Sequence, residues 1–194
     1  LINGNWVTTG KLKDKHWQVA LSQANINGHV EQYPFTVNGD LSINDQYAIN
    51  SNGLTADVLG ASLHVKGHTN KHWNINADLN IPDFSRWLPD ATGDLKAKID
   101  VTGNREKPQL NVNGHSQGIS YQQLQLLGFD IKGLYQLYGK QQFSAQMSLK
   151  QLQQQQAELS HILLAISGNK AKQQLTLSTR GDVDLNANIH NQIS

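Results

Sequence analysis

The chain has 194 residues, with 16 Lys and Arg against 15 Asp and Glu, and it contains no cysteine. The net charge of +1 is too small for the positive field that holds a nucleic-acid backbone, and the missing cysteines exclude disulfide scaffolds and thiolate metal sites. Hydrophobic residues make up 38%, while Asn and Gln supply about a fifth of the chain. We therefore expect a globular core and a polar, mostly uncharged surface.

The ends of the chain carry no signal for targeting or membrane insertion. The first residue is Leu1, no signal-peptide pattern follows it, and no apolar run reaches the roughly 18 residues of a membrane-spanning helix. Because the chain also starts and stops within a strand-like pattern, we expect a piece of a longer protein whose anchor and targeting signals lie elsewhere.

Apolar residues recur at every second position along most of the chain, which is the period of a strand with one dry and one wet face. In residues 95–102, for example, Leu95, Ala97, Ile99 and Val101 alternate with polar residues. This pattern predicts strands, in chain order, at 17–21, 35–43, 63–65, 73–81, 95–102, 110–112, 129–131, 143–149, 162–166, 175–177 and 183–189.

Glycines punctuate the predicted strands in a repeated phrase of an apolar residue, any residue and Gly. Most of these glycines are expected at turns, and one between two apolar positions, Gly39, could instead mark a bulge. The spacing between phrases is irregular, so the pattern indicates a meander rather than a solenoid of fixed repeat length. The phrases end at Gly39, Gly67, Gly103, Gly114, Gly133 and Gly168.

Residues 83–88 break the alternation and predict one short helix of about two turns. Phe84, Trp87 and Leu88 stand at helical spacing, Asp83 fits the N-cap position, and Pro89 closes the segment. We expect these three side chains to plug an apolar surface.

Two motifs suggest chemistry, but their contexts argue against it. The stretch from Gly114 to Gly118 matches the Gly-x-Ser-x-Gly elbow of serine hydrolases, which must open a helix, yet another strand pattern follows it. His64, His68 and His72 stand four apart, which would stack metal ligands on a helix but not on the strand, turn and strand expected here. No phosphate-binding or dinucleotide motif is present. The sequence therefore predicts no enzyme, no metal site and no cofactor.

The apolar face of so many strands must be covered by something. A second sheet, the far wall of a barrel or a hydrocarbon ligand would each serve, and composition does not choose among them. A closed sandwich is the commoner solution in general.

Residues 79–103 and 107–110 carry a resemblance that bears on this choice. A Leu-Pro segment ends at Pro89, Gly93 follows, a strand ends in Val101-Thr102-Gly103, and Pro108 opens the next strand. This arrangement resembles the C-terminal region of the TamB family of translocation and assembly module subunits, in the AsmA-like superfamily of bridge-like lipid transfer proteins. The likeness extends over about residues 75–185.

The resemblance implies an all-β fold: a long antiparallel amphipathic sheet, curled into an open taco-like trough over residues 1–194. It also implies a periplasmic segment of an inner-membrane-anchored protein that moves phospholipid toward the outer membrane or assists outer-membrane protein assembly. The implied partners are phospholipid acyl chains, a TamA-like outer-membrane protein and nascent outer-membrane β-barrel proteins. The alternatives are a module that pairs strands with such barrels, or a closed sandwich from an adhesin. The residues expected to line the groove are Ile75, Leu79, Leu95, Ile99, Val101, Leu110, Val112, Phe143, Met147 and Leu185.

Overall fold

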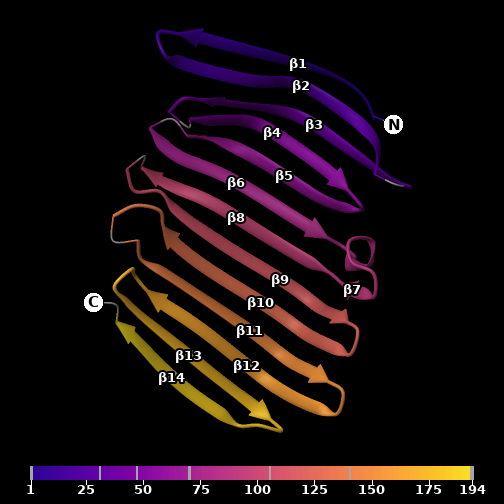
Figure 1. Ribbon diagram of the computed structural model, residues 1–194, viewed down its shortest axis with the longest axis vertical. Helices are drawn as coiled ribbons and strands as arrows, with labels where there is room; N and C mark the ends of the chain where they lie inside the picture. The colour runs from indigo at the N-terminus through magenta and orange to yellow at the C-terminus, as the bar shows by residue number, and fades with distance from the viewer. Residues whose placement is uncertain are drawn as a thin grey trace.

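The computed structural model describes residues 2–30, 32–46, 48–69, 71–104, 106–139 and 141–192. Nearly all of them belong to one antiparallel sheet of 14 strands, which follow one another in chain order except that β7 pairs with β9 beside β8 (Figure 1). The strands are β1 (Ile2–Lys13), β2 (His16–Val30), β3 (Tyr33–Asn44), β4 (Ile49–Val58), β5 (Ala61–Thr69), β6 (His72–Ile81), β7 (Ala91–Gly93), β8 (Leu95–Asn104), β9 (Gln109–Tyr121), β10 (Leu124–Gln136), β11 (Phe143–Gln154), β12 (Ala157–Gly168), β13 (Lys172–Gly181) and β14 (Leu185–Gln192).

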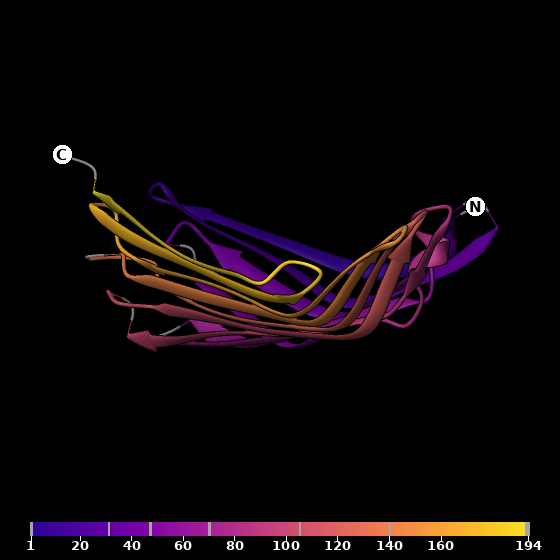
Figure 2. The ribbon, with the colours of Figure 1, turned by 90° about the horizontal axis from the view of Figure 1, so that it is seen from below.

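The sheet is open and forms a single layer. β1 and β14 stand at opposite ends of the strand order, and from the side the strands bend partway along their length while the two end strands lie above the middle ones (Figure 2). The accessible surface is 13014 Å², against about 9,200 Å² for a compact monomer of this mass. The prediction of an open curled sheet is confirmed, and a closed sandwich is not what this chain forms.

Bulges interrupt the ladders of three strands. The register of neighbouring strands shifts by one residue between Leu21 and Ala24 in β2, between Ser51 and Leu54 in β4, and between Ser160 and Leu163 in β12. Each bulge adds one residue to one strand, which curves the ladder and moves the apolar pattern by one position. The predicted alternation is therefore interrupted inside these strands.

A glycine followed by aspartate stands at the bulge in β3, between β7 and β8, and at the end of β13. The Asp40 carboxylate accepts the Asn52 backbone N–H at 3.1 Å, Asp94 accepts that of Gln117 at 2.9 Å, and Asp182 accepts that of Glu158 at 2.7 Å. The preceding glycines have positive φ, 128° at Gly39 and 116° at Gly93, and a Cβ there would collide with the backbone of the next strand. The aspartate thus satisfies a backbone donor of the neighbouring strand.

The repeated glycine phrase has more than one structural meaning. Gly39 lies at a bulge, as one interpretation expects, and Gly103 and Gly168 lie at the ends of β8 and β12. The expected turns at Gly114 and Gly133 are wrong, because both glycines lie inside strands with ordinary backbone angles. There the missing side chain leaves room for neighbours such as Ile131, which a Cβ on Gly114 would strike.

The predicted helix at 83–88 is shorter than expected. Only Phe84–Arg86 form a helix, a single 3-10 turn (η1), because Pro82 and Pro89 leave too few residues for a second turn. Asp83 caps it as predicted and accepts the Ser85 backbone N–H at 2.9 Å. Hydrogen bonds from the Ser85 hydroxyl and backbone lower the pKa of Asp83, so this cap weakens as the pH falls through that pKa.

Replacing Gly39 by alanine should destabilise the sheet. The new Cβ would meet the Gly53 carbonyl oxygen, and the positive φ adds strain, so we expect a loss of about 1–3 kcal/mol in urea denaturation. Gly10→Ala is the matched control, since Gly10 has no positive φ and nothing lies within 4 Å of its Cβ position. Equal effects of the two substitutions would contradict the role assigned to Gly39.

Trp87 and Leu88, which are predicted to plug an apolar surface, are only partly buried. Their contribution to the free energy of unfolding should therefore be smaller than that of fully buried side chains. Trp87 and Leu88 are 47% and 46% exposed. Emptying a fully packed Trp site costs about 3–5 kcal/mol, so Trp87→Ala should cost about half of that, or roughly 2 kcal/mol. Thermal melts with Trp6→Ala as the control, a tryptophan that is 55% exposed on edge strand β1, should show a smaller loss for Trp6.

Candidate functional site: the apolar face of the sheet

One face of the sheet carries two parallel rows of apolar residues that run without a break from β2 to β14. Residues directly opposite one another across a ladder share a face, so the register defines each row. The first row contains Ile26, Val37, Ala56, Leu63, Leu79, Ala97, Gly114, Ile131, Met147, Leu164, Leu177 and Ala187. The second contains Ala24, Gly39, Leu54, Val65, Ala77, Ile99, Val112, Gly133, Ala145, Ile166, Leu175 and Ile189.

These rows form an apolar strip that crosses the strands. Twelve strands take part, and at a spacing of about 4.8 Å they give a strip roughly 50 Å long. No charged or hydrogen-bonding side chain interrupts either row. A third, shorter row lies beside the second and consists of Ile75, Val101, Leu110, Tyr135 and Phe143.

The structure brings all ten residues predicted to line a groove onto this face. Eight of them belong to the three rows, Leu95 lies opposite Ile81, and Leu185 lies opposite Thr179. Sequence reasoning missed the contribution of β2 to β5, including Ile26, Leu54 and Val65. Bulges conceal the alternation in β2 and β4, because the spacing between residues of one face widens there from two to three. That wider spacing is the signal by which these strands could have been assigned to the apolar face.

The buried side chains lie on the apolar face, and from this we infer that the apolar face is the concave one. Leu149 and Ile162, which lie opposite each other beside the bulge in β12, are each 7% exposed, and Ser116 on the same face is fully buried. Side chains on the inside of a bend are covered by their neighbours, whereas those outside it spread apart. Lys150 follows Leu149 in sequence and His161 precedes Ile162. Both lie on the outer face and are exposed.

Most of the concave face is half-exposed and has no packed layer above it. The apolar side chains that are truly buried in the described part of the chain are few: Ala24, Ala61, Ala91, Pro108, Leu149 and Ile162. Beside η1, Trp87 forms one wall of an open pocket of about 240 Å³, whose other walls come from residues such as Leu63, Leu79 and Ile81. Apolar side chains that remain exposed to solvent in the isolated chain are available to bind a ligand.

The convex face is polar. Residues opposite one another there include His64, Asp78, Lys98, Asn113 and Lys132. His64 Nδ1 lies 3.0 Å from the Thr55 hydroxyl, and a second pair joins His115 to Asp130 at 2.8 Å. The two faces therefore differ in chemistry along the whole sheet.

The two motifs considered for catalysis or metal binding lie within strands. Gly114 to Gly118 belong to β9, so the turn into a helix that a hydrolase elbow needs does not occur there. His64 and His68 lie in β5 and His72 in β6. Across the described residues, no three His, Cys, Asp or Glu side chains gather as metal ligands, and no helix is long and apolar enough to cross a membrane.

Comparison with known proteins identifies the family. A family model described as "TamB, N-terminal domain" matches residues 1–194. The chain is also 22% identical over 182 residues to the translocation and assembly module subunit TamB of Haemophilus influenzae, a match that covers 93% of this chain and 14% of that protein. No solved structure matches.

The expected position within the family is not supported. The matching model describes the N-terminal domain, whereas the resemblance implied the C-terminal region. A strand pattern that repeats along a long sheet shows the kind of structure but does not place a segment within it. Because the family model matches the whole length of the chain, the chain belongs to the TamB family.

Proposed function

We propose that the concave face holds the acyl chains of phospholipids and guides them across the strands. The observation that carries the proposal is the pair of unbroken apolar rows on an open, uncovered face. An acyl chain placed there removes both its own surface and the protein's from water, at about 0.8 kcal/mol for each CH₂.

The uniformity of the rows favours transport over storage. Gly, Ala, Val, Ile, Leu and Met succeed one another at strand spacing, so a chain that shifts by one strand, about 4.8 Å, meets nearly the same surface. A ligand with many nearly equivalent positions can slide, whereas a deep pocket would retain it.

Membership of the TamB family supplies the setting of the proposal. The chain spans 14% of the Haemophilus influenzae relative, so it would be one periplasmic segment of a longer, inner-membrane-anchored protein. That protein would work with a TamA-like outer-membrane partner, in phospholipid delivery to the outer membrane and in the assembly of its β-barrel proteins. We infer no enzymatic step and no cofactor for this segment.

The open edges of the sheet support a second candidate function. β1 and β14 each leave one side of their backbone unpaired within the described chain, and every described residue of β1 is exposed. Such an edge can add a strand from another polypeptide, as a chaperone for nascent outer-membrane β-barrel proteins would.

Crosslinking in the full-length protein distinguishes the two candidates. A photoreactive residue at Val112 or Phe143 should capture phospholipid, while one at Asn111 or Ser144, the sequence neighbours on the convex face, should not. Mass spectrometry of the adducts provides the readout. Lipid adducts that ignore this alternation would contradict the proposal, and a further photoreactive residue on β1 that captures protein, with no lipid captured at Val112 or Phe143, would favour strand pairing.

A charge placed on the concave face should block the path. Ile99→Asp puts a carboxylate in the second row, where bound acyl chains would strip it of water, so we expect phospholipid that co-purifies with the protein to fall at least severalfold. Lys98→Asp, one residue away on the convex face, should leave lipid content unchanged. Circular dichroism should show both variants folded, and equal lipid content in both would contradict the proposal.

A further inference from the structure

The two long rims of the trough carry opposite charge. In a meander the turns fall alternately at the two ends of the strands, and each rim is defined here as its turns with one residue on either side. The first, which we term the lysine rim, contains the described residues between β1 and β2, β3 and β4, β5 and β6, β8 and β9, β10 and β11, and β12 and β13. The second, the acidic rim, contains the described residues between β2 and β3, β4 and β5, β6 and β8 with η1 and β7, β9 and β10, β11 and β12, and β13 and β14.

Among the described residues, lysine dominates one rim and aspartate the other. The lysine rim carries Lys13, Lys15, Lys71, Lys107, Lys170 and Lys172 against Asp14, Asp45 and Glu106. The described part of the acidic rim carries Asp83, Asp90, Asp94, Asp182 and Asp184 against Arg86, and it has no lysine. The strands that separate the rims are mostly 10–13 residues long, roughly 35–40 Å, which is several Debye lengths at physiological salt. Salt therefore screens the charges of one rim from the other, and each rim attracts or repels charged groups only in its own vicinity.

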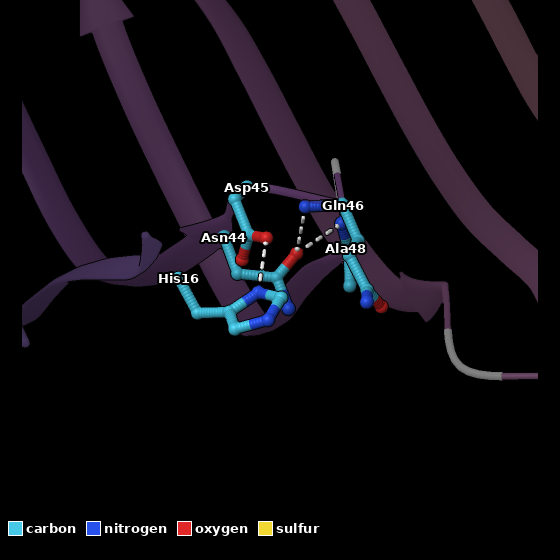
Figure 3. A network of polar contacts seen from close by, with 5 residues as sticks. All are labelled: His16, Asn44, Asp45, Gln46 and Ala48. Carbon is cyan, nitrogen blue, oxygen red and sulfur yellow. Dashed lines mark hydrogen bonds and ion pairs between the residues drawn. The ribbon is translucent and has the colours of Figure 1, made fainter. Parts of the chain in front are cut away.

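The rim lysines are available to a ligand. All six are exposed, and the ion pairs seen in the described part of the chain, His16 with Asp45 and His115 with Asp130, leave them out. Asp45 is one of the three acids on the lysine rim, and its carboxylate lies 2.7 Å from His16 Nδ1 (Figure 3).

The choice of capping residue follows the same division. On the lysine rim the backbone N–H groups of the turns are capped by asparagines: Asn44 accepts from Ala48 at 2.8 Å (Figure 3), Asn104 from Lys107 at 2.7 Å, and Asn169 from Ala171 at 2.9 Å. On the acidic rim Asp83 caps the turn at η1, while Asp94 and Asp182 accept backbone N–H groups of the neighbouring strands β9 and β12. Asparagine and aspartate cap about equally well, so capping alone does not explain why the aspartates stand on one rim.

We propose that the lysine rim binds the phosphate groups of anionic phospholipids, so that lipids lie in the trough with one polarity, headgroups on this rim and acyl chains toward the acidic rim. The inference rests on the proposed function of the concave face. The exposed ammonium groups complement a phosphate on this rim, and the aspartates would repel a phosphate placed on the other rim.

The dimensions of the sheet fit this orientation. One leaflet of a bilayer holds about 15 Å of hydrocarbon, half of its roughly 30 Å core. From His72 at the lysine rim to Ala77 in the second apolar row is five residues, or about 17 Å of strand. Acyl chains anchored at this rim would therefore cross the third row and reach the second, and successive strands would offer the same arrangement.

Two photoreactive lipids test the polarity in the full-length protein. Vesicles of phosphatidylglycerol would carry a trace of an analogue with a diazirine on the headgroup, or of one with the diazirine at the end of an acyl chain. Adducts are mapped by peptide mass spectrometry. We expect headgroup adducts on the lysine rim to exceed those on the acidic rim about tenfold, and acyl adducts on the apolar rows.

A charge-reversed variant and its control complete the test. Lys13→Glu, Lys15→Glu, Lys170→Glu and Lys172→Glu together should abolish the headgroup preference. Lys66→Glu, Lys96→Glu, Lys98→Glu and Lys132→Glu, the same charge change on exposed lysines of the convex face, should preserve it.

The outcomes separate this inference from the proposed function. Headgroup adducts shared equally by both rims, or a preference that survives reversal of the rim lysines, would overturn the polarity while acyl adducts on the rows still supported a lipid trough. Absence of acyl adducts from the rows would overturn the trough itself.

Discussion

The structure depends on one constraint, an apolar sheet face that no second layer covers. A typical domain buries such a face against another element, and this burial supplies most of its stability. Here the continuous backbone ladder and the side-chain contacts along each apolar row must hold the sheet, with Leu149 and Ile162 among the few buried side chains. The same lack of cover leaves hydrocarbon surface available, so the stability problem and the proposed function have one origin.

Curvature makes that uncovered face usable. A flat sheet would expose both faces equally, whereas this sheet is bent, and bulges in β2, β4 and β12 contribute curvature to it. The aspartates that follow Gly39, Gly93 and Gly181 accept backbone N–H groups of the neighbouring strands. Local polar contacts thus set the shape of an apolar surface.

Charge adds a direction to a surface that is otherwise nearly uniform. The apolar rows repeat from strand to strand and do not distinguish one orientation of a lipid from another. The rims differ, because exposed lysines such as Lys71 and Lys170 lie at one end of the strands and aspartates such as Asp90 and Asp184 lie at the other. In the proposed arrangement the hydrophobic face provides affinity and mobility, and the rims provide polarity.

Alternation in the sequence determined the all-β class, the two chemically distinct faces and the face on which Ile99, Val112 and Phe143 lie, because strand geometry alone sends successive side chains to opposite sides. The choice between an open trough and a closed sandwich depends on contacts between distant segments, which periodicity does not encode. The bulges that place Leu54 beside Val65 and the short 3-10 turn at Phe84 follow from ladder register and local backbone limits. A net charge of +1 conceals the separation of lysine from aspartate, since only the meander brings Lys13 and Lys172 to one rim and Asp94 and Asp182 to the other.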